Sequence, residues 1–170
     1  MSLAFFRELF VKSEMPLWLV LIRLVLGLEW FLAGWSKVSN PEFAGGLVKT
    51  LGFFVSKNPH SWYVGLVNDQ IIPNVAVFAV LVAWGELLAG LSLLSGLLLG
   101  VGLLAGIFMN LNFYFAAGWT SPSTASLNLI MIVFQGILFC AVGSRVLGLD
   151  WLIAKKFPRL GKALMVYGHK

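Results

Sequence analysis

The sequence is poor in charged residues and rich in apolar ones. Only 11% of its 170 residues are charged, while 59% are hydrophobic. An average soluble domain has about 25% charged residues. A water-soluble protein of this composition would be unable to cover its own surface with polar groups. The composition therefore predicts an integral membrane protein.

Cysteine and histidine are too scarce to build a metal centre. Cys140 is the single cysteine, and the two histidines are His60 and His169. One thiol excludes an intramolecular disulfide, a CxxC redox pair and a cysteine-ligated iron–sulfur cluster held by this chain alone. Neither histidine lies in a long apolar run, which excludes a bis-histidine haem inside a helix bundle. We therefore expect no metal or haem on this chain alone.

Four apolar runs are long enough to cross a bilayer, which takes roughly 20 helical residues. So few residues separate the second run from the third that these two form a tight helical hairpin. We therefore predict a single all-α domain over residues 1–170, an integral membrane four-helix bundle. The predicted spans cover about residues 16–35, 73–94, 97–117 and 126–142.

The connection between the first two spans is too long for a simple turn and is rich in aromatic residues. We expect it to form amphipathic helices that lie on the membrane surface. Arg7, Lys12 and a basic tail over residues 145–170 fall on the opposite side of the membrane from this loop. Because lysine and arginine favour the cytoplasmic side, we predict a multi-pass protein of the cell membrane with both termini in the cytoplasm. The tail then lies near anionic lipid, and we do not expect it to bind nucleic acid.

Three ionisable residues lie inside the predicted spans: Arg23, Glu29 and Glu86. Each costs about 2.5–3.5 kcal/mol at the centre of a membrane helix on insertion scales, so each needs a partner. At 1.5 Å per residue, Arg23 and Glu86 lie roughly 10 and 12 Å from the cytoplasmic ends of their spans. This depth predicts an Arg23–Glu86 ion pair, which either fixes the helix register or handles a proton or ligand. Glu29 points about 120° away from Arg23 around the helix.

A second set of polar residues gathers in the outer half of the predicted bundle. A quinone head group needs hydrogen-bond donors for two carbonyl oxygens, apolar walls and access from lipid, and this set offers the donors. The alternative is hydrogen bonding between helices together with ordinary interfacial aromatic residues. The candidate quinone-binding residues are Lys37, Trp35, Asn112, Asn128 and Tyr114.

Two segments resemble the DoxX/DoxD family of small four-helix membrane proteins. The first holds RLVLG at residues 23–27 and GWSK at residues 34–37. The second holds GELLAG at residues 85–90 and, after the hairpin, NLNFY at residues 110–114. The helix count, the long first loop and the tight second loop also fit this family, and the resemblance covers about residues 17–142.

The resemblance implies a link to respiratory redox chemistry. DoxD is a subunit of an archaeal thiosulfate:quinone oxidoreductase, and the long outer loop makes this chain look closer to DoxD than to the shortest DoxX proteins. We therefore expect a quinone-reactive membrane protein in which Glu86, Arg23 and Glu29 are the candidate catalytic residues. Quinone is the expected ligand or substrate, and membrane lipid with a redox subunit or a second copy of the chain are the expected partners.

Two alternatives remain open. In the first, the bundle is a non-catalytic membrane anchor or accessory subunit of a respiratory or oxidative-stress redox complex, and its buried charges only hold the helices together. In the second, Arg23, Glu86 and Glu29 form a relay for protons or small solutes.

Overall fold

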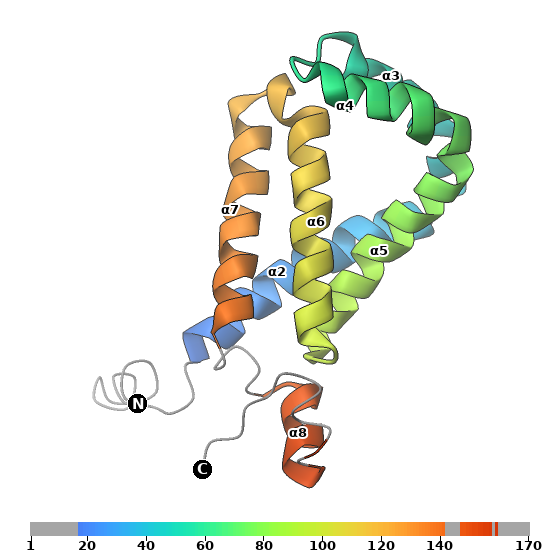
Figure 1. The fold of residues 1–170 in the computed structure, drawn as a ribbon. Coiled ribbons are helices and arrows are strands. Elements are labelled where there is room, and N and C mark those ends of the chain that lie inside the picture. Colours follow the sequence, from blue (N-terminus) through green and yellow to red (C-terminus); the bar gives the residue numbers. More distant parts are fainter. Residues whose placement is uncertain (1–16, 142–146, 158, 160–170) are drawn as a thin grey trace.

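The computed structural model describes residues 17–141, 147–157 and 159. These residues form helices and contain no strand. Figure 1 shows long helices side by side, with two shorter helices across one end and α8 at the other. The helices are α2 (Leu17–Val38), α3 (Phe43–Ser56), α4 (Ser61–Leu66), α5 (Val75–Ser95), α6 (Leu99–Ala117), α7 (Pro122–Cys140) and α8 (Leu149–Lys156).

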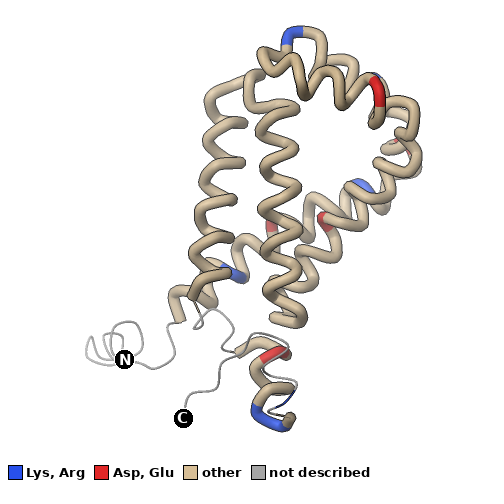
Figure 2. Tube along the Cα trace, in the orientation of Figure 1, with Lys and Arg blue, Asp and Glu red and all other residues tan. Residues whose placement is uncertain are grey.

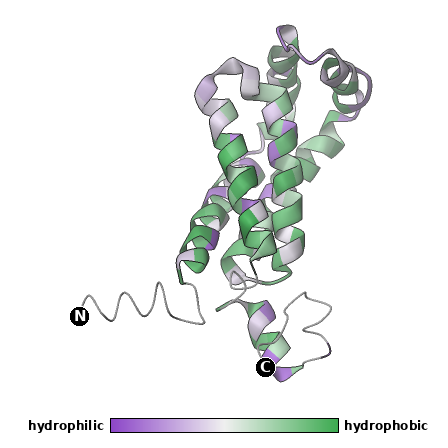
Figure 3. Ribbon diagram, turned by 60° about the vertical axis from the view of Figure 1, so that its left-hand side comes forward, coloured by the Kyte–Doolittle hydropathy of each residue, from purple (hydrophilic) through white to green (hydrophobic). Residues whose placement is uncertain are grey.

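Four helical stretches in the described residues are long and apolar enough to cross a membrane. They are Leu17–Val38, Ser61–Ser95, Leu99–Thr120 and Pro122–Cys140. The all-α membrane bundle predicted from the sequence is thus confirmed. Figure 3 shows that hydrophobic residues dominate the long helices, and Figure 2 shows only isolated charged positions along them.

The second span is longer than the sequence predicted. A π-helical turn over Val67–Ile71 and a 3-10 turn over Ile72–Asn74 join α4 to α5, so the helical path runs on from Ser61 to Ser95. Pro73 lies in the 3-10 turn, where its missing N–H is tolerated. The predicted start at residue 73 marks this change in helix type and is not the start of the helical stretch.

The long helices pack in the order α2, α5, α6 and α7, and α2 also contacts α7. Glycine sets how closely α2 and α5 approach. A Cβ added at Gly34 would overlap the backbone nitrogen of Leu87, and one added at Gly90 would overlap that of Phe31. Because small residues allow such close backbone contact in lipid, these glycines fix the register of the two helices.

A second close approach joins three helices at the centre of the bundle. The Trp30 indole N–H on α2 donates to Gln135 Oε1 on α7 at 3.3 Å. The amide of Gln135 lies against Gly106 of α6, where a Cβ would overlap it. Gln135 Nε2 also donates to the carbonyl of Met131 at 2.9 Å. This buried hydrogen bond lies inside the main apolar core, which includes Leu26, Leu93, Leu103 and Leu138.

The short helices α3 and α4 are hydrogen-bonded to the C-terminal end of α6. Asn58 donates from its side-chain amide to the carbonyls of Phe115 and Ala116, at 2.8 and 3.1 Å. These carbonyls belong to the last turn of α6, which has no partners for them within the helix. Trp119 donates to the carbonyl of Phe54 in α3 at 3.0 Å. The helices predicted in the first loop are therefore present, and they form a cap fixed to the bundle.

At the other end, α8 binds the tight hairpin between α5 and α6. The Asp150 carboxylate accepts hydrogen bonds from the backbone N–H groups of Leu98 and Leu99, both at 2.9 Å. The N–H of Asp150 donates to the carbonyl of Gly96 at 2.9 Å. An acidic side chain at a helix N-terminus satisfies its unpaired N–H groups and complements the helix dipole. Asp150 thus caps α6 from a separate helix.

Candidate functional site

The strongest charge contact within the spans joins the last turn of α2 to the middle of α5. Lys37 Nζ donates to Glu86 Oε2 at 2.6 Å. The Glu86 side chain is 2% exposed and that of Lys37 is 27% exposed. Lys37 Nζ also donates to the carbonyl of Ala33 at 3.3 Å. The pair therefore places a buried acid behind a cation that reaches the protein surface.

The predicted partner of Glu86 was wrong. Glu86 pairs with Lys37, and Arg23 lies at the other end of the α2–α5 contact. The depth argument assumed that both helices cross the bilayer in equal register. The contact between Gly34 and Leu87 instead sets Glu86 opposite the C-terminal end of α2.

Arg23 occupies a separate buried position beside the α5–α6 hairpin. Its side chain is 1% exposed. The guanidinium lies close to Gly96, and Asp150 is the acidic group that acts on it electrostatically. Sequence reasoning missed Asp150 because it lies in the tail, outside the predicted spans. The signal that could have found it is an acidic residue that follows Gly148 and opens a short apolar helix.

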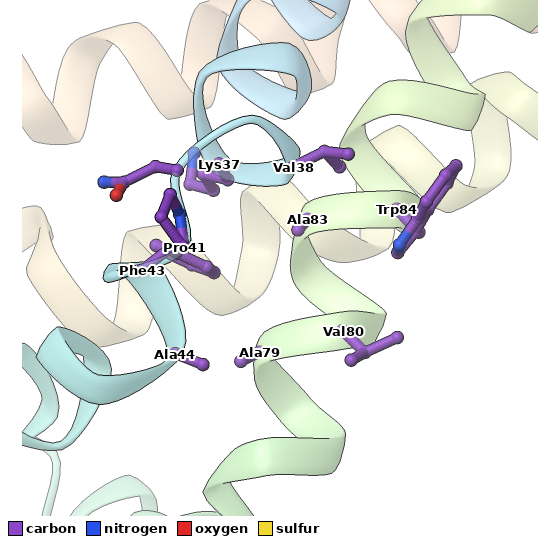
Figure 4. A pocket seen from close by; sticks show the side chains of 10 residues that line it. Lys37, Val38, Pro41, Phe43, Ala44, Ala79, Val80, Ala83 and Trp84 are labelled. Carbon is purple, nitrogen blue, oxygen red and sulfur yellow. The ribbon is translucent and has the colours of Figure 1, made fainter.

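Lys37 also lines a small pocket between the end of α2, the start of α3 and the face of α5 (Figure 4). The volume of the pocket is about 150 Å³. A cavity of about this size holds one benzene ring. Its walls are mostly apolar, with Lys37 and Asn40 as the polar side chains. The lining residues are Lys37, Val38, Asn40, Pro41, Phe43, Ala44, Ala79, Val80, Ala83 and Trp84.

The other four predicted quinone-binding residues do not line this pocket. Asn112 and Asn128 each donate to a carbonyl one turn earlier in their own helices, at Phe108 and Thr124. The Tyr114 ring packs edge-on against Phe115. Trp35 is exposed and its ring stacks on that of Phe31. Of the five candidate quinone-binding residues, the structure thus places Lys37 beside Glu86 and at the pocket, and the other four away from the pocket lining.

Glu29, the third candidate catalytic residue, is exposed on the surface of α2. Among the residues that the structure describes, no hydrogen bond or ion pair joins it to the rest of the chain. It is therefore separate from both the Lys37–Glu86 pair and the Arg23 position.

One buried amide donor belongs to neither polar group. Asn110 lies one turn from Gly106 on the same face of α6 and is 2% exposed. Its Nδ2 atom has no hydrogen-bond partner within the described residues. In the same part of the chain, no three His, Cys, Asp or Glu side chains are grouped as metal ligands.

Comparison with known families identifies this architecture. The family model described as DoxX matches residues 18–119, which is more than half of the chain and includes α2 to α6. The matched part contains both residues of the ion pair and the whole pocket lining. Comparisons with curated proteins and with solved structures found no match.

Proposed function

Because the chain belongs to the DoxX family, we propose that it is a quinone-reactive membrane protein whose pocket beside Lys37 takes the quinone ring. One observation carries this proposal: a ring-sized, mostly apolar pocket has Lys37 at its edge, and Lys37 is paired with the buried Glu86 behind it. Val80 and Trp84 line the pocket and are largely exposed on the side of α5 that faces lipid. A ligand dissolved in the bilayer can therefore enter from the side.

The chain's own residues then bind, orient and exchange a proton. Lys37 Nζ and the Asn40 amide are donors for a carbonyl oxygen at the edge of the ring. The alanines at residues 79 and 83 leave room for its flat face. Reduction of a quinone takes two electrons and two protons. The Lys37–Glu86 pair can pass one proton to the oxygen it faces, and water at the open side of the pocket supplies the proton for the other oxygen. Burial of Glu86 behind Lys37 keeps this proton out of contact with bulk water.

The electron donor we propose is thiosulfate. Two thiosulfate ions join through a new S–S bond to give tetrathionate and release two electrons, which balances the two electrons taken up by one quinone. A thiosulfate dianion needs cations or several hydrogen-bond donors. Lys49 and Lys57 are exposed at α3 and its end, near the pocket end of the bundle. Together with Lys37 at the pocket, they are the lysines that can bind the dianion at this end.

The binding step is tested by photolabelling with an azidoquinone in lipid vesicles. We expect the label on the α5 segment that contains Ala79 and Ala83. Ala83→Leu fills part of the pocket while keeping both residues of the ion pair, and it should reduce this labelling strongly. Val77→Leu, which lies on the exposed face of α5 outside the pocket, is the matched control. Labelling that maps elsewhere and is indifferent to Ala83→Leu contradicts the proposed site.

The redox step is tested by following reduction of a short-chain quinone with thiosulfate as donor. Loss of a positioned proton donor costs typically about 10²–10⁴-fold in rate, so Glu86→Gln should lower turnover by that order while quinone labelling persists. Lys156→Ala, in the exposed part of α8, should have the wild-type rate. A wild-type rate in Glu86→Gln would exclude this residue from proton transfer.

A non-catalytic accessory subunit is the second candidate function, because the Lys37–Glu86 ion pair joins α2 to α5 and can serve to hold these two helices together. It makes a distinct prediction. Thiosulfate would then reduce quinone only when a separate redox subunit is added, and the rate would survive both Glu86→Gln and Ala83→Leu.

A further inference from the structure

Glu29 lies at the middle of a membrane span. It comes 12 residues after Leu17 and nine before Val38, the two ends of α2. At 1.5 Å per residue these distances are about 18 and 14 Å. A glutamate side chain is too short to reach the membrane surface from such a depth. The exposed carboxyl group of Glu29 therefore faces hydrocarbon in a single copy of the chain.

The face of α2 around Glu29 is apolar and uncovered. Val25, one turn before Glu29, is 68% exposed, and Leu32 is 54% exposed. The opposite face of α2 carries Gly27 and Gly34 and packs on α5. Intramembrane ionisable residues almost always face a bundle interior, a water-filled cavity or another polar group. The position of Glu29 thus indicates that something covers this face.

Few side chains of a second copy could pair with the Glu29 carboxyl group. The described residues of the four long helices hold two cations, Arg23, which is 1% exposed, and Lys37, which is paired with Glu86. Lys37 lies eight residues from Glu29, about 12 Å along the helix, so a second copy brings neither cation to the level of Glu29. A carboxyl group that holds a proton is both a hydrogen-bond donor and an acceptor. Two such groups are complementary to each other. In a two-fold symmetric contact each residue on the axis meets its own counterpart.

We infer that two copies of the chain associate along this face of α2, with Glu29 of one copy hydrogen-bonded to Glu29 of the other. Both copies insert in the same orientation, so the two-fold axis runs along the membrane normal. The pair removes both carboxyl groups from lipid, and the surrounding apolar residues exclude water. This inference does not depend on quinone binding.

The geometry is tested by disulfide cross-linking in lipid vesicles, in a Cys140→Ser background. Val25→Cys places a thiol one turn from Glu29, and we expect it to give a covalent dimer on mild oxidation. Val101→Cys on α6 is the matched control, because Val101 is 64% exposed. Gly27 and Gly102 both approach Leu93, so Val25 and Val101 lie at similar depth. Equal cross-linking at the two positions, or none at Val25→Cys, overturns the proposed interface.

The chemistry is tested by the association constant of the full chain, measured as the fraction of paired subunits against the protein-to-lipid ratio. Glu29→Gln keeps a donor and an acceptor and should still dimerise. Glu29→Leu removes both, and at the strength of hydrogen bonds between membrane helices we expect about tenfold weaker association. The side chain is exposed, so folding of the Leu variant should be unchanged by circular dichroism.

Two outcomes overturn the inference. One is a Glu29→Leu variant that dimerises as strongly as the wild type. The other is a wild-type chain that is monomeric at every lipid ratio, which would instead indicate a different membrane subunit with a basic side chain at the level of Glu29.

Discussion

Gly34 decides which charges meet in this bundle. Gly34 has no side chain at the point where α2 and α5 touch, so the backbone of Leu87 can come into contact with it. The same approach sets Glu86 beside the last turn of α2, where Lys37 can reach it. A methyl group at this position has no room unless the two helices separate.

We therefore predict that Gly34→Ala destabilises the bundle, by about 1–3 kcal/mol as for other overpacked sites. It should also loosen the contact between Lys37 and Glu86. Gly136→Ala is the control, because a Cβ there meets nothing within 4 Å and alanine is favoured over glycine in a helix by roughly 0.5–1 kcal/mol. Unfolding in mixed detergent micelles measures the free energy of unfolding of both variants. Equal stability of the two variants would show that α2 and α5 can move apart at no cost.

Residue-level contacts were the part of the site hardest to predict from the sequence. Lys37 and Glu86 were both recognised as candidates, but depth alone matched Glu86 with Arg23. Depth ignores the glycine contacts that shift one helix along the other. The partner of Arg23 was out of reach for another reason: Asp150 lies 127 positions away, beyond the last span.

At the level of elements, α8 and the α5–α6 hairpin stabilise each other. The turn holds Leu98 at φ 50°, a backbone conformation that a branched side chain rarely adopts. The Asp150 carboxylate binds the N–H groups of Leu98 and Leu99 and so supports this turn. Arg23 beneath it adds a positive charge.

Removing this cap should free α8. We predict that Asp150→Ala costs about 0.5–2 kcal/mol, the range for lost helix caps, and speeds hydrogen exchange at the amides of Leu98 and Leu99. Leu152→Ala, an exposed position in the same helix, serves as the control. Unchanged protection of both amides in Asp150→Ala would mean that the hairpin keeps its shape without α8.

Elements were easier to predict than contacts, because hydropathy and length decide them. All four spans, the tight hairpin and the helices of the first loop are present. The exception is the start of the second span, because the helical path of residues 61–72 runs on into α5, although the sequence there carries Asn68, Asp69 and Gln70. These three residues lie in the π-helical turn over Val67–Ile71. The hydrophobic periodicity of the sequence does not predict such a turn.

For the whole molecule, the four spans bring the start of α2 and the end of α7 to the same end of the bundle, opposite α3 and α4 (Figure 1). Which side of the membrane this end faces is predicted from the lysine and arginine residues alone. The pocket lies at the opposite end, near α3. The orientation of the bundle therefore decides from which side of the membrane an ionic electron donor such as thiosulfate reaches the pocket.

We predict that the end bearing α3 and α4 is extracytoplasmic. In a Cys140→Ser background, Thr50→Cys in α3 should react with a membrane-impermeant maleimide in intact cells. Lys156→Cys in α8 should react only after the membrane is opened. Both side chains are exposed. The reverse pattern of labelling would place the termini outside and the pocket in the cytoplasmic leaflet.

The docking of α8 has a consequence for biogenesis. A ribosome makes α8 after all four spans, and Asp150 binds groups from the turn between the second and third spans. Its binding site, next to Arg23 of the first span, exists only once these helices have been inserted and packed. The attachment of α8 thus requires that the first three spans have been inserted and packed. A chain with a misplaced span would leave α8 undocked, with its backbone open to proteases of the quality-control machinery.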